Sequence, residues 1–171
     1  MQSRTLSVLV ENQAGVLCRV SGLFSRRGYN IQSLAVGETA HPQISRMTIR
    51  IAHDEPRALR QIIHQLLKLE CVRKAVFLDE GTAILRELIL VKVVCTPETR
   101  SEIIQIANVF RAQVVDLSRG AMMLELTGDD SKTAAFLGLL NDFGILEVAR
   151  TGALALSRGE GSIEEDAEAE A

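Results

Sequence analysis

The chain has 171 residues, of which 19 are basic and 22 acidic, so its formal net charge is −3. Its hydrophobic content of 47% is typical of a folded globular protein, which excludes wholesale disorder, and no apolar run approaches the ~20 residues of a membrane-spanning helix. The three cysteines Cys18, Cys71 and Cys95 are far apart and form no C-x-x-C pair, so we expect neither disulfides nor a zinc ribbon, and a cytoplasmic location.

The first half of the chain alternates strand-like and helix-like patterns of apolar residues. One helix is expected from Val16, with Gly28 ending it, and a second from residues 54–56, where Pro56 would occupy the first turn. The predicted strands are residues 4–10, 30–36, 44–52 and 72–79. The expected order of elements is therefore β-α-β-β-α-β.

The second half repeats that order. Thr96 followed by Pro97 predicts the start of one helix, and Asp129 and Gly144 predict the start and end of another. The predicted strands are residues 87–95, 113–117, 122–127 and 145–156. We therefore predict an α+β protein made of two ferredoxin-like βαββαβ domains.

The expected boundaries follow from these patterns. The N-terminal domain would span residues 1–79, a linker residues 80–86, and the C-terminal domain residues 87–159. Residues 160–171 hold six acidic residues, no basic residue and one large apolar side chain, so we expect a disordered acidic tail. Some strands are apolar on both faces, which predicts a homodimer through a sheet face or a sheet edge.

Residues for catalysis are hard to find in this sequence. The histidines His41, His53 and His64 lie near no serine or cysteine in a recognisable nucleophile frame, and no histidine or cysteine spacing suits a metal. Cys18 is expected to be a buried structural thiol. The central strands lack the aromatic residues that stack RNA bases, and Tyr29 is the only tyrosine. We expect no catalytic residue, no metal site, no nucleic-acid partner and no membrane partner.

The segment between the first strand and the first helix is the candidate binding site. A helix start presents free N–H groups that suit a carboxylate, and Gly15 would let a ligand approach the backbone. Asn12 and Asn30 supply amide groups, and both could point toward this helix start. These features suit a free amino acid. The simpler alternative is that Asn12 only caps the helix and Gly15 only eases a turn.

Several long motifs resemble one family. Residues 6–17, 22–34 and 45–49 resemble the ACT domain of the small, regulatory subunit of acetolactate synthase (acetohydroxyacid synthase). Residues 90–93, 110–116, 147–152 and 156–159 resemble the C-terminal domain of the same subunit. The resemblance covers residues 1–159, almost the whole chain.

The resemblance implies a regulatory subunit without catalytic activity. It would activate a separate catalytic subunit in branched-chain amino-acid biosynthesis and confer feedback inhibition, commonly by valine. That large subunit, which condenses pyruvate to 2-acetolactate, would bind thiamine diphosphate, Mg and FAD. This chain would bind no cofactor. The effector would bind where two ACT domains meet in a homodimer, at Asn12, Gly15, Val16 and Leu17 of one chain and Asn30 and Ile31 of its partner.

The chemistry of these residues suggests their roles within that site. Backbone amides around Gly15 would hold the effector's carboxylate, the two asparagines its polar end, and Val16, Leu17 and Ile31 its apolar side chain. The second half has Thr96, Pro97 and Glu98 at the equivalent turn, so only the first unit is expected to bind an effector.

Other readings stay open at this point. The chain could be an ACT-domain amino-acid sensor of a different enzyme, a small enzyme in its own right, or an assembly protein without a ligand. Valine, leucine and isoleucine all remain candidates, because one methylene in an apolar pocket changes binding by only ~1–3 kcal/mol.

Overall fold

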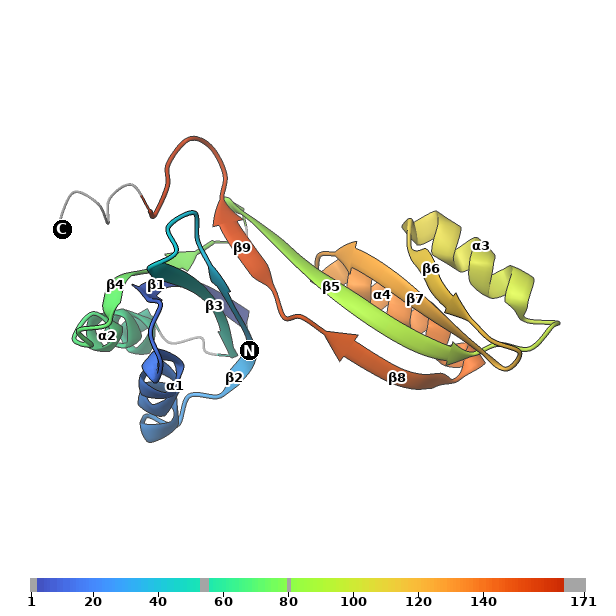
Figure 1. The fold of residues 1–171 in the computed structure, drawn as a ribbon, viewed down its shortest axis with the longest axis horizontal. Helices are drawn as coiled ribbons and strands as arrows, with labels where there is room; N and C mark the ends of the chain where they lie inside the picture. The colour runs from blue at the N-terminus through green and yellow to red at the C-terminus, as the bar shows by residue number, and fades with distance from the viewer. Residues whose placement is uncertain (1–2, 53–55, 80, 165–171) are drawn as a thin grey trace. The chain divides into compact units, whose positions relative to one another are not determined.

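The computed structural model describes residues 3–52, 56–79 and 81–164, and these form two compact units. The first unit combines the chain up to Ile84 with the segment from Ala153 onward, and the second is Leu85–Gly152. Each contains an antiparallel sheet and two α-helices, as Figure 1 shows. The two ferredoxin-like βαββαβ folds are confirmed. No helix among the described residues is long and apolar enough to span a membrane.

The first unit has the sheet order β2-β3-β1-β4, and all three strand pairs are antiparallel. Its elements are β1 (Ser3–Glu11), α1 (Val16–Arg26), β2 (Ile31–Glu38), β3 (Ile44–Ala52), α2 (Pro56–Leu66) and β4 (Val72–Leu78). One face of the sheet packs on both helices: Leu6 and Val8 of β1 share a buried core with Phe24 of α1 and Ile62 of α2. The expected helix start at Asp54 and Glu55, and also His53, lie outside the described residues.

Helix α1 is positioned by its apolar stripe. Val16, Val20, Leu23 and Phe24 are buried, which is the i, i+4, i+7, i+8 spacing of one helix face. Gly28 follows the helix with a φ of 71°, and its N–H donates to the Ser25 carbonyl at 3.1 Å, so the expected C-terminal stop is confirmed.

Cys18 differs from expectation. The expectation of a buried thiol is wrong because position 18 lies off the apolar stripe, and its side chain is exposed. The neighbouring Leu17 is 45% exposed for the same reason. An exposed leucine beside the start of α1 is therefore left available for contact with another molecule.

The second unit has the order β6-β7-β5-β8. Its elements are β5 (Ala83–Val94), α3 (Arg100–Phe110), β6 (Gln113–Leu117), β7 (Ala121–Gly128), α4 (Asp130–Leu140), the 3-10 turn η1 (Asn141–Phe143) and β8 (Ile145–Arg150). Val91 of β5 and Leu124 of β7 share a buried core with Ile103 of α3 and Phe136 of α4.

Helix α3 begins later than predicted. The expected start, Thr96 as cap and Pro97 as first helical residue, is wrong, because α3 begins at Arg100 with Thr99 as its N-cap. The backbone N–H of Thr96 donates to the Thr99 hydroxyl at 3.0 Å, and the two hydroxyls lie 3.3 Å apart. The two threonines thus stabilise a separate turn before the helix.

The boundaries between the units also differ from the expected ones. Strand β5 begins at Ala83, within the expected linker. The extended segment expected at residues 145–156 is two strands, because Gly152 adopts a φ of 80° between β8 and β9 (Leu154–Ser157). Strand β9 pairs with β5 and belongs to the first unit. The last strand of the expected C-terminal domain is therefore part of the N-terminal unit.

Strand β9 and Glu164 cover part of the outer face of the first sheet, the face turned away from α1 and α2. Strand β9 lies against β1 and β4, and Figure 1 shows it on the side of the sheet opposite the helices. Ser7 and Leu9, which point to this outer face, have no solvent exposure, and Thr48 is 1% exposed. The chain thus covers in cis the sheet face that we expected to be free for association.

The described part of the acidic tail also contacts this sheet. Residues 160–164 lack regular structure, but the Glu164 carboxylate pairs with the Arg46 guanidinium of β3 at 2.6 Å. Expected disorder from Glu160 onward is therefore wrong for this part. Residues 165–171 lie outside the described residues.

Asp129 caps α4 as predicted. Its carboxylate accepts from the backbone N–H of Lys132 at 2.9 Å and from the Ser131 hydroxyl at 2.8 Å, and these bonds lower the pKa of Asp129.

Asp129→Ala should destabilise α4 by ~1 kcal/mol, measured as roughly five-fold faster hydrogen exchange of the α4 amides. Asp129→Asn keeps a hydrogen-bond acceptor, so its α4 amides should exchange more slowly than those of Asp129→Ala.

The pH dependence of this cap has a defined sign. Because the folded pKa lies below the unfolded one, the carboxylate stabilises α4 fully above the unfolded pKa of about 4, and this is lost as pH falls through the folded pKa. The α4 amides of the wild type should therefore exchange more slowly than those of Asp129→Asn at neutral pH, and this difference should shrink at low pH. Unchanged exchange in Asp129→Ala at neutral pH would contradict the assignment.

Candidate functional site

The start of α1 is an open backbone site. Gly15 is the N-cap residue, with a φ of 84°, and no side chain caps the helix. The first turn carries no acidic residue, and a Cβ added at Gly15 would have no heavy atom within 4 Å. A helix start has unsatisfied N–H groups and a positive partial charge. The Val16 N–H donates to the Gln13 carbonyl at 3.4 Å, but the N–H groups of Leu17 and Cys18 have no protein acceptor among the described residues, so the turn can accept an anion such as a carboxylate.

Asn12 does not cap this helix, and that alternative is wrong. Its side-chain amide donates to the Glu38 carboxylate at 3.0 Å and to the Pro42 carbonyl at 2.9 Å. Its backbone N–H donates to the Gln43 carbonyl at 2.8 Å. Asn12 therefore ties the turn before α1 to the loop between β2 and β3. The side-chain oxygen of Asn12 has no protein donor among the described residues and remains available to a ligand.

A hollow of about 370 Å³ lies beside this turn. It is lined by Glu11, Asn12, Gln13, Pro42, Gln43 and Arg73. The Arg73 guanidinium and the Glu11 carboxylate pair there at 3.2 Å. The lining is mostly polar, so this hollow suits the charged end of a small ligand rather than an apolar side chain.

Asn30 lies at the other end of α1. Strands β1 and β2 are both antiparallel to β3 and so run in the same direction, with Asn12 after the end of β1 and Asn30 before the start of β2. The 11 residues of α1 separate these ends by about 16 Å, at 1.5 Å per residue. The expectation that both asparagines of one chain point to the same helix start is therefore wrong.

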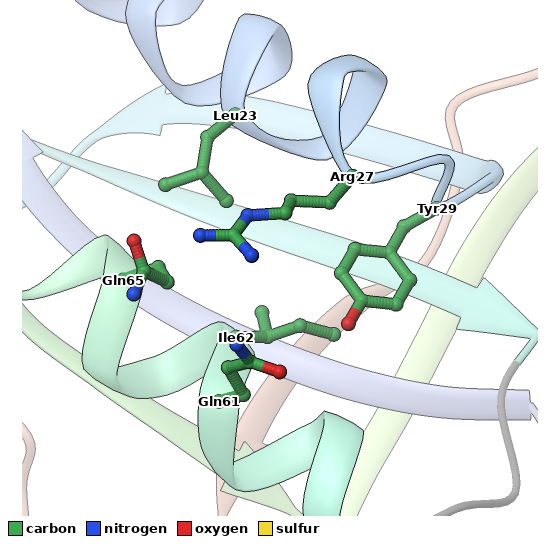
Figure 2. A pocket seen from close by; sticks show the side chains of 6 residues that line it. All are labelled: Leu23, Arg27, Tyr29, Gln61, Ile62 and Gln65. Carbon is green, nitrogen blue, oxygen red and sulfur yellow. The ribbon is translucent and has the colours of Figure 1, made fainter.

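Figure 2 shows the end of α1 that adjoins Asn30. The Arg27 guanidinium and the Tyr29 ring extend over a small hollow between α1 and α2, whose floor and far side include Ile62 and Gln65. The Tyr29 N–H donates to the Phe24 carbonyl at 3.0 Å, which fixes the chain where it leaves the helix. Asn30 follows directly and is exposed.

The apolar residues predicted to line the effector site also lie at the two opposite ends of α1. Val16 is 4% exposed and packs in the core, so it offers a ligand its backbone and not the side-chain surface that we expected. Leu17 remains exposed at the start of α1, whereas Ile31 is half-buried near Asn30. One chain therefore brings together Asn12, Gly15 and Leu17, and places Asn30 and Ile31 apart from them.

Sequence reasoning missed Glu38 and Pro42. Glu38 ends β2 and Pro42 lies in the polar loop that follows, which has no motif of its own, and only the pairing of β1 with β3 brings them beside Asn12. An acidic residue at the end of a strand is too common to have identified Glu38.

The equivalent turn of the second unit has different chemistry. Glu98 receives hydrogen bonds from the Thr96 side chain and from its own backbone N–H, and both lower its pKa. It is therefore ionised at neutral pH, and a carboxylate ligand at this turn would meet a like charge.

No grouping of side chains for a metal ion is found among the described residues. No three histidine, cysteine or acidic side chains within residues 3–52, 56–79 and 81–164 are placed to hold a metal ion. His41 and His64 are both exposed, while Cys71 and Cys95 are buried.

Comparison with known families gives two matches that together span most of the chain. Residues 6–74 match the AHAS small subunit-like ACT domain, and residues 86–159 match the small subunit of acetolactate synthase.

Individual relatives agree with these matches. The chain is 48% identical to the probable acetolactate synthase small subunit of Archaeoglobus fulgidus, over 91% of this chain and 96% of that protein. It is 50% identical to the acetolactate synthase small subunit of Mycolicibacterium smegmatis, over 92% of each. The crystal structure of the acetolactate synthase small subunit from Thermotoga maritima superposes with a TM-score of 0.86 and 37% identity, covering 94% of this chain and 100% of that one.

The contacts of Asn12 lead to a direct test. In Asn12→Asp, a carboxylate would face the Glu38 carboxylate and the Pro42 carbonyl, and two hydrogen bonds would be lost. We expect the free energy needed to open the loop of residues 39–44 to fall by ~1–3 kcal/mol. This would be seen as faster hydrogen exchange at the amides of Thr39 and Ile44. Gln13→Glu adds the same charge one residue away and is the matched control. Equal exchange in both variants would show that Asn12 does not hold the loop.

Proposed function

Because the chain belongs to the acetolactate synthase small-subunit family, we propose that it activates the catalytic subunit of that enzyme and makes it sensitive to valine. The catalytic subunit, not this chain, binds thiamine diphosphate and catalyses the condensation of pyruvate to 2-acetolactate. The small subunit binds the effector, and both subunits act in the cytoplasm.

The open helix start supports the effector part of this proposal. Valine needs donors for its carboxylate, an acceptor for its ammonium group and an apolar surface for its side chain. The uncapped turn at Gly15 supplies the donors, the Asn12 side-chain oxygen the acceptor, and exposed Leu17 part of the apolar surface.

A homodimer completes this site. Asn30 and Ile31 lie at the far end of α1 from Gly15, so they reach an effector only from a second chain. Strand β2 is an edge strand of its sheet and carries exposed Val36, whereas the outer sheet face is covered by β9. We therefore place the dimer contact along the β2 edge and α1, where two symmetric copies form two equivalent sites.

Feedback inhibition requires that valine bind two arrangements of the small subunit with different affinity. Occupation of a site shared by two chains favours the arrangement in which both chains contact the effector. A coupling free energy of ~1–3 kcal/mol would account for feedback inhibition of ordinary strength.

Gly15→Asp tests the function. A carboxylate at the helix start would repel the effector's carboxylate, so we expect valine inhibition of the reconstituted enzyme to be lost while activation is retained. Gly15→Asn is the matched control, because asparagine tolerates a positive φ and carries no charge. Gly15→Asn should lose less valine sensitivity than Gly15→Asp. Undiminished inhibition in Gly15→Asp would refute the site, and a pure small subunit that converts pyruvate unaided would refute the regulatory role.

Asn30→Ala tests the contribution of the second chain. Loss of its amide hydrogen bonds should weaken valine binding by ~1–3 kcal/mol, measured by isothermal titration of the full chain. The control is Asn141→Ala, an exposed asparagine of the second unit. Equal valine affinity in the two variants would remove Asn30 from the site.

A further inference from the structure

A second cavity lies on the outer face of the first sheet, between the ends of β2 and β3 and the segment that covers them. Its volume is about 280 Å³, near the lower end of the ~300–1,000 Å³ of ligand pockets, so it admits only a small molecule. It is lined by Gly37, Glu38, Thr39, Arg46, Thr48, Leu154, Ala155, Leu156 and Glu164. All of these residues belong to the first unit.

Arg46 is the central charged group of this cavity. Its side chain is 16% exposed, one terminal nitrogen donates to the Ser7 hydroxyl at 3.2 Å, and the other pairs with Glu164 at 2.6 Å. A guanidinium this deeply placed is costly without an anionic partner, and its planar donors match a carboxylate. The carboxylate it now holds comes from the chain's own tail.

The rest of the lining is of mixed character. The lining includes the hydroxyl-bearing residues Thr39 and Thr48 and the apolar residues Leu154 and Leu156, which are 60% and 58% exposed. Charged, hydroxyl and apolar groups in one small cavity match a molecule with a carboxylate at one end and a short apolar group at the other.

We propose that this cavity is a second ligand site, which binds a small carboxylate with a short apolar side chain on Arg46 in competition with Glu164. Amino acids and 2-oxo acids share this chemistry. Binding exchanges one carboxylate for another on the same guanidinium, so Arg46 is never left unpaired. The released Glu164 then no longer ties residues 159–164 to the sheet, whereas β9 stays paired with β5 and the Arg158 N–H stays bonded to the Thr82 carbonyl.

This site is separate from the helix start of α1. Arg46 lies on the outer face of β3, whereas Gly15 follows the end of β1 and opens a helix on the other face. Glu38 connects the two places, since it lines the cavity and accepts a hydrogen bond from Asn12. The inference does not depend on valine binding at Gly15.

The test uses the full chain carrying Gly15→Asp, which disables the helix-start site. Valine and its 2-oxo analogue, 3-methyl-2-oxobutanoate, are titrated separately and followed by NMR shifts of the amides of β3. We expect at least one of them to bind, and the arm that binds identifies the source of the ligand. Adding Glu164→Gln should tighten binding about ten-fold, because it removes a tethered competitor.

Two arginine variants make the result specific. Arg46→Gln should abolish binding, and Arg46→Lys, which keeps the charge but loses the two-pronged donor, should weaken it if Arg46→Gln fails to fold. Lys92→Gln, which breaks a 3.4 Å ion pair with Glu147 in the second unit, should change nothing. Binding of neither probe, or equal affinity with and without Glu164→Gln, would overturn the proposal.

Discussion

The uncapped start of α1 determines what the first unit can do. The backbone N–H groups of Leu17 and Cys18 have no protein acceptor among the described residues, because the N-cap is a glycine and the nearest asparagine is engaged elsewhere. An anion therefore finds donors already oriented, without a side chain to displace. The same geometry separates Asn12 from Asn30 by the length of a helix, so an effector that contacts both must contact two chains. The proposed regulation would use this arrangement, because an effector in a shared site would also join the two chains.

The covered sheet face is the second constraint. A ferredoxin-like unit has one sheet face free of helices, and here β9 and Glu164 lie on that face. The edges and helices are thereby left for the proposed association of copies. The covering segment also follows directly on β8 of the second unit through Gly152. A change in how Arg46 holds Glu164 therefore acts on a segment that is covalently continuous with both units.

Much of the fold could be predicted from local patterns. Alternating apolar residues identified the strands, and Gly28 and Asp129 marked helix ends that the structure confirms, because each acts through its own backbone or immediate neighbours. The start of α3 was mispredicted because two threonine hydroxyls stabilise a competing turn at Thr96 and Thr99.

Long-range features could not be predicted in this way. The place of β9 depends on which sheet it packs against, and the role of Asn12 depends on a loop 26 to 30 residues away in sequence. The sequence predicted a helix start with a glycine before it, and the structure has both, while ligand binding there stays a prediction. Its division between two ends of α1 required the strand register.

The central claim, a site built from two chains, is tested most directly by mixing two defective variants. Gly15→Asp disables the helix start and leaves Asn30 intact. Asn30→Ala removes the Asn30 amide and leaves the helix start intact. Valine binding should be lost in Gly15→Asp alone and weakened in Asn30→Ala alone, and a mixed dimer should recover one intact site, so a site of wild-type affinity should return after subunit exchange. If each site lay within one chain, both chains of the mixed dimer would remain defective, and no site of wild-type affinity would return.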